Sequence, residues 1–100
     1  MSRLSDALAS IARLVESRML VNPTTKSRTR SAIRAKATYY FLLRDMGFSL
    51  NEMGLLLGIN HTSIMHHVND EEKRLDLEDD IKALTPRARK AMRLYKDGVK

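Results

Sequence analysis

The chain has 100 residues, a length that suits one domain with a small core, and it contains no cysteine, which excludes a disulfide framework and a thiolate metal site. No stretch approaches the roughly 18 apolar residues of a membrane span, and the N-terminus lacks the apolar core and cleavage site of a signal peptide. Eighteen Lys and Arg residues against twelve Asp and Glu residues give a net charge of +6. We therefore expect one domain, residues 1–100, in the cytoplasm and without membrane contact.

The charges are unevenly distributed along the chain. Residues 24–36 hold five bases and no acid, residues 70–80 hold seven acids against two bases, and residues 82–100 hold seven bases against one acid. Two basic segments that flank an acidic one indicate a polyanionic partner. The alternative is a surface that is merely basic, because a basic patch is by itself a weak signal.

An amphipathic helix is expected in the N-terminal segment, residues 1–22. Apolar residues recur over residues 3–20 at spacings that place them on one helical face, namely Leu4, Leu8, Ile11, Val15 and Met19. Asn22-Pro23 ends the helix, because proline disfavours helical geometry in the residue before it. We expect this face to pack either on the domain itself or on a second copy of the chain, as a homodimer.

A basic loop is expected over residues 23–31, which contain no aliphatic or aromatic side chain. Bases alternate there with Ser and Thr, and both kinds of side chain contact phosphates. A narrow minor groove also attracts an arginine from a flexible arm. The candidate DNA-contacting residues of the loop, within residues 24–31, are Lys26, Arg28 and Arg30, and the alternative is a solvated linker.

A long apolar helix is expected over residues 32–46, capped by Ser31 and ended by Gly47. Arg34 and Lys36 lie near its start, where the helix dipole disfavours cations and favours an anion. The two bases are therefore candidates for contact with a phosphate bound at this helix end.

The segment 49–69 is predicted to form two short helices joined by a tight turn, which is a helix-turn-helix. Ser49 and Glu52 have the spacing of a capping box, Gly58 supplies a left-handed residue at the turn, and Asn60 caps the second helix. The stripe that the first helix is expected to bury consists of Leu50, Met53, Leu56 and Leu57.

The second of these helices, expected over residues 61–72, carries candidate base-reading groups. Ile64 is expected to face the core, and the candidate DNA-contacting residues are Asn60, His61, Thr62, Ser63, Met65 and His66. His, Thr and Asn side chains bond base edges or phosphates, and Met65 can meet a thymine methyl group. No charge occurs between Glu52 and Asp70, so phosphate attraction must come from elsewhere in the chain.

The tail, residues 76–100, is expected to end in a basic helix that Thr85 caps, with Pro86 at its first position. Its bases are Arg87, Arg89, Lys90, Arg93 and Lys96. Three roles stay open for it: a second phosphate-contacting surface, a partner for the acidic segment, or a solvated helix.

These patterns predict an all-α protein, a small helical bundle built around a helix-turn-helix within residues 32–75, with an N-terminal amphipathic helix and a basic C-terminal helix. Residues 20–75 resemble the C-terminal DNA-binding domain of DnaA, the bacterial replication initiator, in the Trp-repressor-like helix-turn-helix superfamily. The resemblance rests on the basic loop, the long helix, Ser49-Leu50-Asn51-Glu52-Met53-Gly54, Gly58 and His61-Thr62-Ser63-Ile64.

The resemblance implies sequence-specific binding of short double-stranded DNA sites. Residues 61–63 would lie in the major groove or on adjacent phosphates, Arg28 or Arg30 would enter the minor groove, and Lys36 would make a polar contact. The expected function is that of a stand-alone regulator of replication or transcription, such as a viral or mobile-element protein.

The chain departs from the family pattern in three ways. It has no phosphate-binding loop of an ATPase, so it is not expected to be an ATP-driven initiator itself. Its turn is one residue shorter, with only Ile59 and Asn60 before His61, and lacks the Arg and Asp usual there, so the preferred DNA sequence is expected to differ. His66 and His67 add polar groups later in the helix.

The rival prediction is a helical protein–protein interaction module, such as a virus assembly adaptor or an inhibitor of a host replication protein. A third reading, an enzyme or metal protein, has less support. His66 and Asp70 are spaced like a pair of metal ligands, but no second ligand group converges with them. We therefore expect no catalytic residue, no metal and no cofactor.

Overall fold

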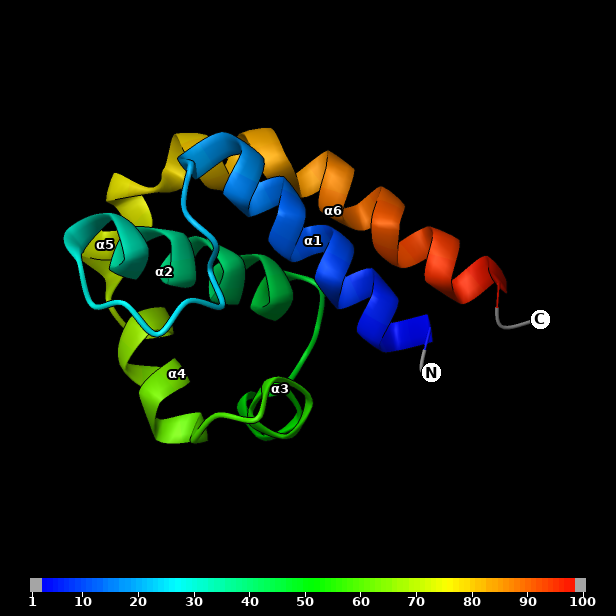
Figure 1. The fold of residues 1–100 in the computed structure, drawn as a ribbon, viewed down its shortest axis with the longest axis horizontal. Coiled ribbons are helices and arrows are strands. Elements are labelled where there is room, and N and C mark those ends of the chain that lie inside the picture. The colour runs from blue at the N-terminus through cyan, green and yellow to red at the C-terminus, as the bar shows by residue number, and fades with distance from the viewer. Residues whose placement is uncertain (1–2, 99–100) are drawn as a thin grey trace.

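The computed structural model describes residues 3–98, and this part of the chain forms six α-helices and no strand (Figure 1). The all-α fold class is confirmed. In chain order the helices are α1 (Arg3–Met19), α2 (Arg30–Asp45), α3 (Leu50–Leu57), α4 (His61–Val68), α5 (Glu71–Asp76) and α6 (Glu78–Gly98). No helix in the described range combines the length and the apolar character that crossing a bilayer requires.

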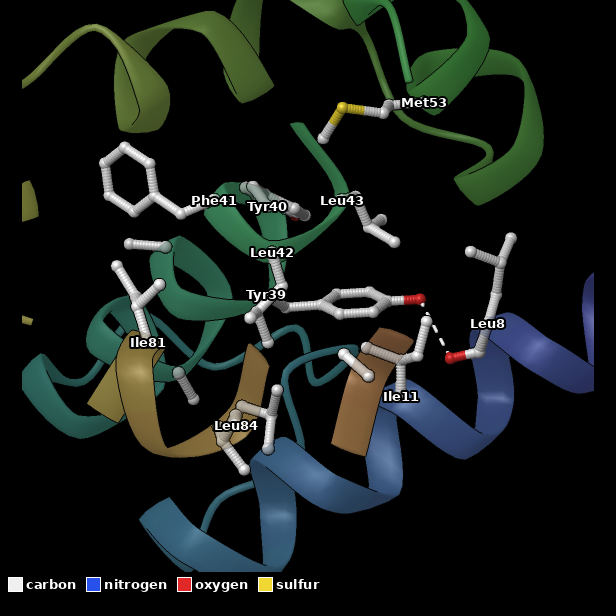
Figure 2. Close-up of a cluster of buried hydrophobic side chains, with 14 of the residues drawn as sticks. Leu8, Ile11, Tyr39, Tyr40, Phe41, Leu42, Leu43, Met53, Ile81 and Leu84 are labelled. Carbon is white, nitrogen blue, oxygen red and sulfur yellow. Dashed lines mark hydrogen bonds between the residues drawn. The ribbon is translucent and has the colours of Figure 1, made fainter. Parts of the chain in front are cut away.

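Helix α2 is the centre of the bundle. Every residue from Ala37 to Leu43 is buried, as expected of a helix with other helices on several sides. The Tyr39 hydroxyl donates a 3.2 Å hydrogen bond to the carbonyl oxygen of Leu8, which ties α2 to α1 (Figure 2). Burial raises the pKa of this phenol, so Tyr39 is a neutral member of the core.

Helix α1 packs along α6 and against α2 (Figure 1). Leu8, Ile11 and Val15 of its predicted apolar face are buried, and Leu4 and Met19 are partly buried against the same core. The first expectation for this helix, packing on its own domain, is therefore confirmed. The apolar face that a homodimer would have used is covered by α6 and α2.

Helix α6 runs without a break through the position where the sequence predicted a new helix. Pro86 lies inside it, and the Thr85 hydroxyl donates to the carbonyl of Ile81 at 2.7 Å instead of capping. Proline within a helix costs about 3 kcal/mol, because it removes a hydrogen bond and crowds the preceding turn. Burial of one continuous apolar face offsets this cost and keeps the helix whole; its members are Ile81, Leu84, Ala88 and Met92.

The start of α2 also differs from the prediction. Thr29, not Ser31, is the N-cap, and its hydroxyl accepts a hydrogen bond from the Ala32 amide at 3.2 Å. Two hydroxyl residues were available two positions apart, and the chain uses the earlier one. The basic loop is therefore shorter than predicted, and Arg30 belongs to the first turn of α2.

Candidate nucleic-acid interface

Helices α3 and α4 form the helix-turn-helix pair that the sequence predicted. The Ser49 hydroxyl accepts from the Glu52 amide at 3.1 Å, and the Ser49 amide donates to Glu52 Oε1 at 3.0 Å, so the capping box is complete. The hydrogen bond from the Ser49 backbone amide, followed by an interaction with the Ser49 side chain, lowers the pKa of the Glu52 carboxyl. Gly58 ends α3 with φ of +68°, in the left-handed region that glycine adopts without strain.

The turn between the two helices is closely packed at Gly54. The Ile59 amide donates to the Gly54 carbonyl at 3.1 Å. A Cβ atom at residue 54 would lie 2.9 Å from the Ile59 carbonyl oxygen and 3.5 Å from the Cβ of His61. A larger side chain would therefore push the start of α4 away from α3, which explains why the sequence places glycine here.

Helix α4 is anchored by Ile64, which is fully buried as predicted, while Asn60 caps its start by accepting from the Thr62 amide at 2.9 Å. The helix ends at Val68, so the prediction that it continues to residue 72 is wrong. Asp70 is the N-cap of the separate helix α5, accepting from the Lys73 amide at 3.0 Å. Asp70, which the sequence placed inside the predicted helix 61–72, therefore lies between two separate helices, α4 and α5.

The outward face of α4 presents the neutral polar side chains that the sequence singled out. His61, Thr62, Ser63 and His66 are exposed, and Met65 is half-buried beside them. The capping Asn60 is exposed too, with its amide oxygen engaged by Thr62. Among the exposed groups, those at residues 61–63 stand at the start of the helix.

The C-terminal end of α4 is less suited to a phosphate backbone. A hollow of about 520 Å³ there is lined by Met65 and His66 together with Asn69, Asp70, Glu71 and Glu72. Three carboxylates beside this end of the helix repel an anionic ligand. An anionic ligand is therefore favoured at the N-terminal end of α4, around His61, over the C-terminal end.

His67 does not belong to the outward face. Its ring packs edge-on against Tyr40, with 5.4 Å between ring centroids, and its buried Nδ1 has no hydrogen-bond partner in the described residues. Burial, followed by the charges of Lys73 and Lys36 and by His66, lowers the pKa of this imidazole. The three-residue spacing from Ile64, which puts both on one helical face, is the sequence signal for this role.

The basic loop is ordered by its own hydroxyl groups. The Thr25 and Ser27 hydroxyls accept from the amides two residues on, those of Ser27 and Thr29, each at 3.3 Å. Ser27 Oγ also donates to Thr29 Oγ1 at 3.4 Å. The hydroxyls that were expected to contact phosphates therefore bond the loop itself, and the loop begins at Pro23, which is buried rather than solvated.

Three bases alternate with these hydroxyl residues: Lys26, Arg28 and Arg30. All three are exposed, and none forms a hydrogen bond or ion pair with another residue of the described chain. The loop thus displays unpaired positive charge on a backbone that its own side chains hold.

The other two predicted phosphate contacts, Arg34 and Lys36, already have partners in the chain. Arg34 pairs through Nη1 with Asp76 of α5, and Lys36 Nζ donates to the Ser27 carbonyl oxygen at 2.9 Å. Their sequence separation from these partners is 42 and nine residues. Of the five predicted cations, the three in and next to the loop are the ones free to meet a ligand.

Lys36 connects the loop to α4. Its ammonium group donates to the loop at Ser27, and its charge is one of those that lower the pKa of His67 on the inner side of α4. In Figure 1 the loop runs past the end of α4 that leads into α5, and the start of α4 lies next to α3. The candidate interface therefore combines a neutral polar helix end with a row of unpaired cations.

In the described part of the chain, no three His, Asp or Glu side chains are grouped so that they can hold a metal ion. Comparison of the chain with protein-family models, with curated proteins and with solved structures found no match.

Proposed function

We propose that this protein binds double-stranded DNA at specific sequences, with the start of α4 in the major groove and the basic loop on phosphates or in the minor groove. The single observation that carries the proposal is the exposed neutral face at residues 61–63 together with the unpaired cations Lys26, Arg28 and Arg30 in and next to the loop. Neutral hydrogen-bonding side chains suit base edges, and cations suit the phosphate backbone.

The division of labour follows from the charges. The helix-turn-helix carries no charge between Glu52 and Asp70, so α4 adds little to attraction for DNA of any sequence. The loop supplies that attraction but has few groups that distinguish base pairs. Removing α4 contacts should therefore reduce specificity, and removing loop charges should reduce affinity for every sequence. A role as a regulator of replication or transcription, in keeping with the DnaA-like pattern, is part of the proposal.

The experiment is a selection of random duplexes at moderate salt, followed by binding measurements on the enriched site and on an unrelated duplex. His61→Ala should weaken binding by about 1–3 kcal/mol on the enriched site and far less on the unrelated duplex. The double variant Arg28→Gln, Arg30→Gln should weaken binding to both, and its affinity should depend less steeply on salt, by about 0.9 in log–log slope per lost phosphate contact.

Arg13→Gln is the matched control, because Arg13 is an exposed and unpaired base on α1, outside the interface. It should bind both duplexes like the wild type. If no motif is enriched, and the His61 and loop variants bind as the wild type does, the proposed function is wrong.

A second candidate is a protein-interaction module that uses the outer side of α3. Leu55 is 86% exposed, Leu56 is 40% exposed although the sequence predicted its burial, and Ile59 is 37% exposed. An exposed apolar cluster of this kind suits a protein partner. Salt separates the two functions, because binding to an apolar patch changes little between 50 and 200 mM salt, whereas duplex binding falls steeply.

A further inference from the structure

The C-terminal half of α6 carries four exposed bases outside the proposed interface: Arg87, Arg89, Lys90 and Arg93. No acid occurs between Ile81 and Tyr95. None of the four forms a hydrogen bond or an ion pair with another described residue. Lys96 is beyond the side chains that the structure describes.

Within the described residues, the acidic segment forms no ion pair with these four bases, and three of its carboxylates pair with other cations. Asp80 accepts from Arg18 of α1 at 2.7 Å, and Glu78 accepts from Lys82 one turn along α6 at 2.9 Å. Asp76 is held by α2, as described above. The expectation that the tail is the partner of the acidic segment therefore fails for the four bases.

Few acids approach the four bases in space. A hollow of about 680 Å³ between α1 and α6 has Arg87 and Lys90 on one lip and Asp6 on the other. Arg89 and Arg93 line a second hollow with Asp45, whose carboxylate is already bound by an arginine of α5 at 2.7 Å. The α6 face is therefore strongly positive, and its charge is available to a ligand.

This face lies apart from the proposed DNA interface. Helix α4 turns Ile64 and His67 towards α2, and α6 turns Ala88 and Met92 towards the core that α2 shares. Figure 1 shows α4 towards one end of the molecule and the C-terminal half of α6 towards the other. The bases of α6 therefore form a surface separate from the start of α4.

We propose that the α6 face, residues 87–93, is a second site for the phosphate backbone of duplex DNA, so that one copy of the protein bridges two duplexes. The proposal rests on the proposed function for its first duplex. Four unpaired bases on consecutive turns of one helix match the closely spaced charges of a duplex, which carries about one phosphate per 1.7 Å of axis. The contacts are with phosphates, so the second duplex is bound whatever its sequence.

The test is a bridging assay with the full chain. A duplex carrying the enriched site is fixed to beads, protein is added at low concentration, and a fluorescent duplex of unrelated sequence is then offered. The wild type should retain the fluorescent duplex, and the quadruple variant Arg87→Gln, Arg89→Gln, Lys90→Gln, Arg93→Gln should lose at least nine-tenths of it. Protein on the beads, measured separately, should be the same for both.

Charge-retaining and partial variants accompany this test. The triple variant Arg87→Lys, Arg89→Lys, Arg93→Lys should bridge like the wild type, because contact with phosphates needs positive charge and not arginine in particular. The control Arg13→Gln should also bridge. If the quadruple variant does not give the wild-type circular dichroism spectrum, the double variants Arg87→Gln, Lys90→Gln and Arg89→Gln, Arg93→Gln replace it. Each should then lower retention severalfold.

The outcomes separate the two proposals. Protein that stays on the beads without retaining a second duplex overturns bridging and leaves the proposed function standing. Bridging that persists in the quadruple variant, or bridged complexes whose mass corresponds to two copies of the protein, also overturns it, because the second duplex would then be held by a second copy. Protein that fails to discriminate the enriched site on the beads contradicts the proposed function instead.

Discussion

The helix-turn-helix pair and the α1–α2–α6 half of the molecule are stabilised by different means. In the latter, burial dominates: α2 is enclosed on several sides, and α1 and α6 contribute whole apolar faces such as Ile11, Val15, Ile81 and Leu84. Helices α3 and α4 each have a single buried residue, Met53 and Ile64. Partly buried side chains such as Leu50, Leu57 and Val68 pack against the core, and caps and a glycine turn stabilise the pair further.

This difference suits the proposed function. Each helix of eight residues is too short to be stable alone, so packing must hold the pair in place, with α3 against α4 and α4 against α2. The same arrangement leaves most side chains of α3 and α4 at the surface, where they can meet a ligand. In the proposed function, the well-buried half supports the sparsely anchored half, which makes the contacts with DNA.

The largest expected effect comes from removing an anchor in each region. Ile11→Ala and Ile64→Ala should each lower the free energy of unfolding by about 2–5 kcal/mol, because both side chains are fully buried. Urea denaturation measures this effect. Ile64→Ala should in addition loosen α4 locally, so its amides should exchange faster in the native state and specific DNA binding should weaken in the folded protein.

Ile11→Ala should leave the DNA affinity of the folded protein unchanged. Equal loss of DNA affinity in the two variants would contradict the separation into a support and a contact region.

The next largest effect is expected from substitution of the glycine in the turn between α3 and α4. Gly58→Ala should lower the free energy of unfolding by about 1–2 kcal/mol, because an L-residue is strained at φ of +68°. Gly58→Asn is the control and should cost less, since asparagine tolerates the left-handed region. Thermal unfolding of the three proteins measures the order, and an alanine variant as stable as the asparagine variant would show that the turn relaxes.

The capping box should contribute about as much as a typical cap. Ser49→Ala removes the acceptor of the Glu52 amide and should lower the free energy of unfolding by about 1 kcal/mol. Ser49→Asp retains an N-cap acceptor and should stay within a few tenths of the wild type. Chemical denaturation resolves this difference, and a Ser49→Ala variant of wild-type stability would mean that water replaces the cap at no cost.

The smallest expected effect is a pH dependence at His67. Its pKa in the folded protein is lowered below the ordinary value of 6.5, so the unfolded chain binds its proton more readily. The free energy of unfolding should therefore fall as the pH drops from 6.5 through the folded-state pKa, and it should be unaffected by this group above pH 7. Denaturation at several pH values should show this slope in the wild type.

His67→Gln should lose this slope, and His66→Gln, altered on the exposed neighbour, should retain it. A slope that survives in His67→Gln would assign the pH dependence to other groups.

Much of the contact region could be predicted from sequence because its determinants are local. Ser49, Gly54, Gly58 and Asn60 act within a few residues of their own positions, and spacing alone reveals such devices. The burial of Ile64 followed from the same short-range pattern.

The predictions that the structure contradicts concern features that depend on contacts between residues far apart in the sequence. Proline is favoured at the first position of a helix, yet Pro86 lies inside α6, because packing against α1 and α2 keeps the helix continuous. Arg34 resembled a phosphate ligand until the fold brought Asp76 beside it from 42 positions away. Likewise, the continuous acidic run gave no sign that Asp70 would start a new helix.

The central claim, that DNA meets the start of α4 and the basic loop, is tested most directly by chemical-shift mapping. Amide resonances of the full chain are followed while the enriched duplex is added below one equivalent. We expect the largest changes at residues 26–30 and 60–63, with α1 unaffected and residues 87–93 changing only as more duplex is added. Changes confined to α1 and α6, with the loop and the start of α4 unmoved, would contradict the claim.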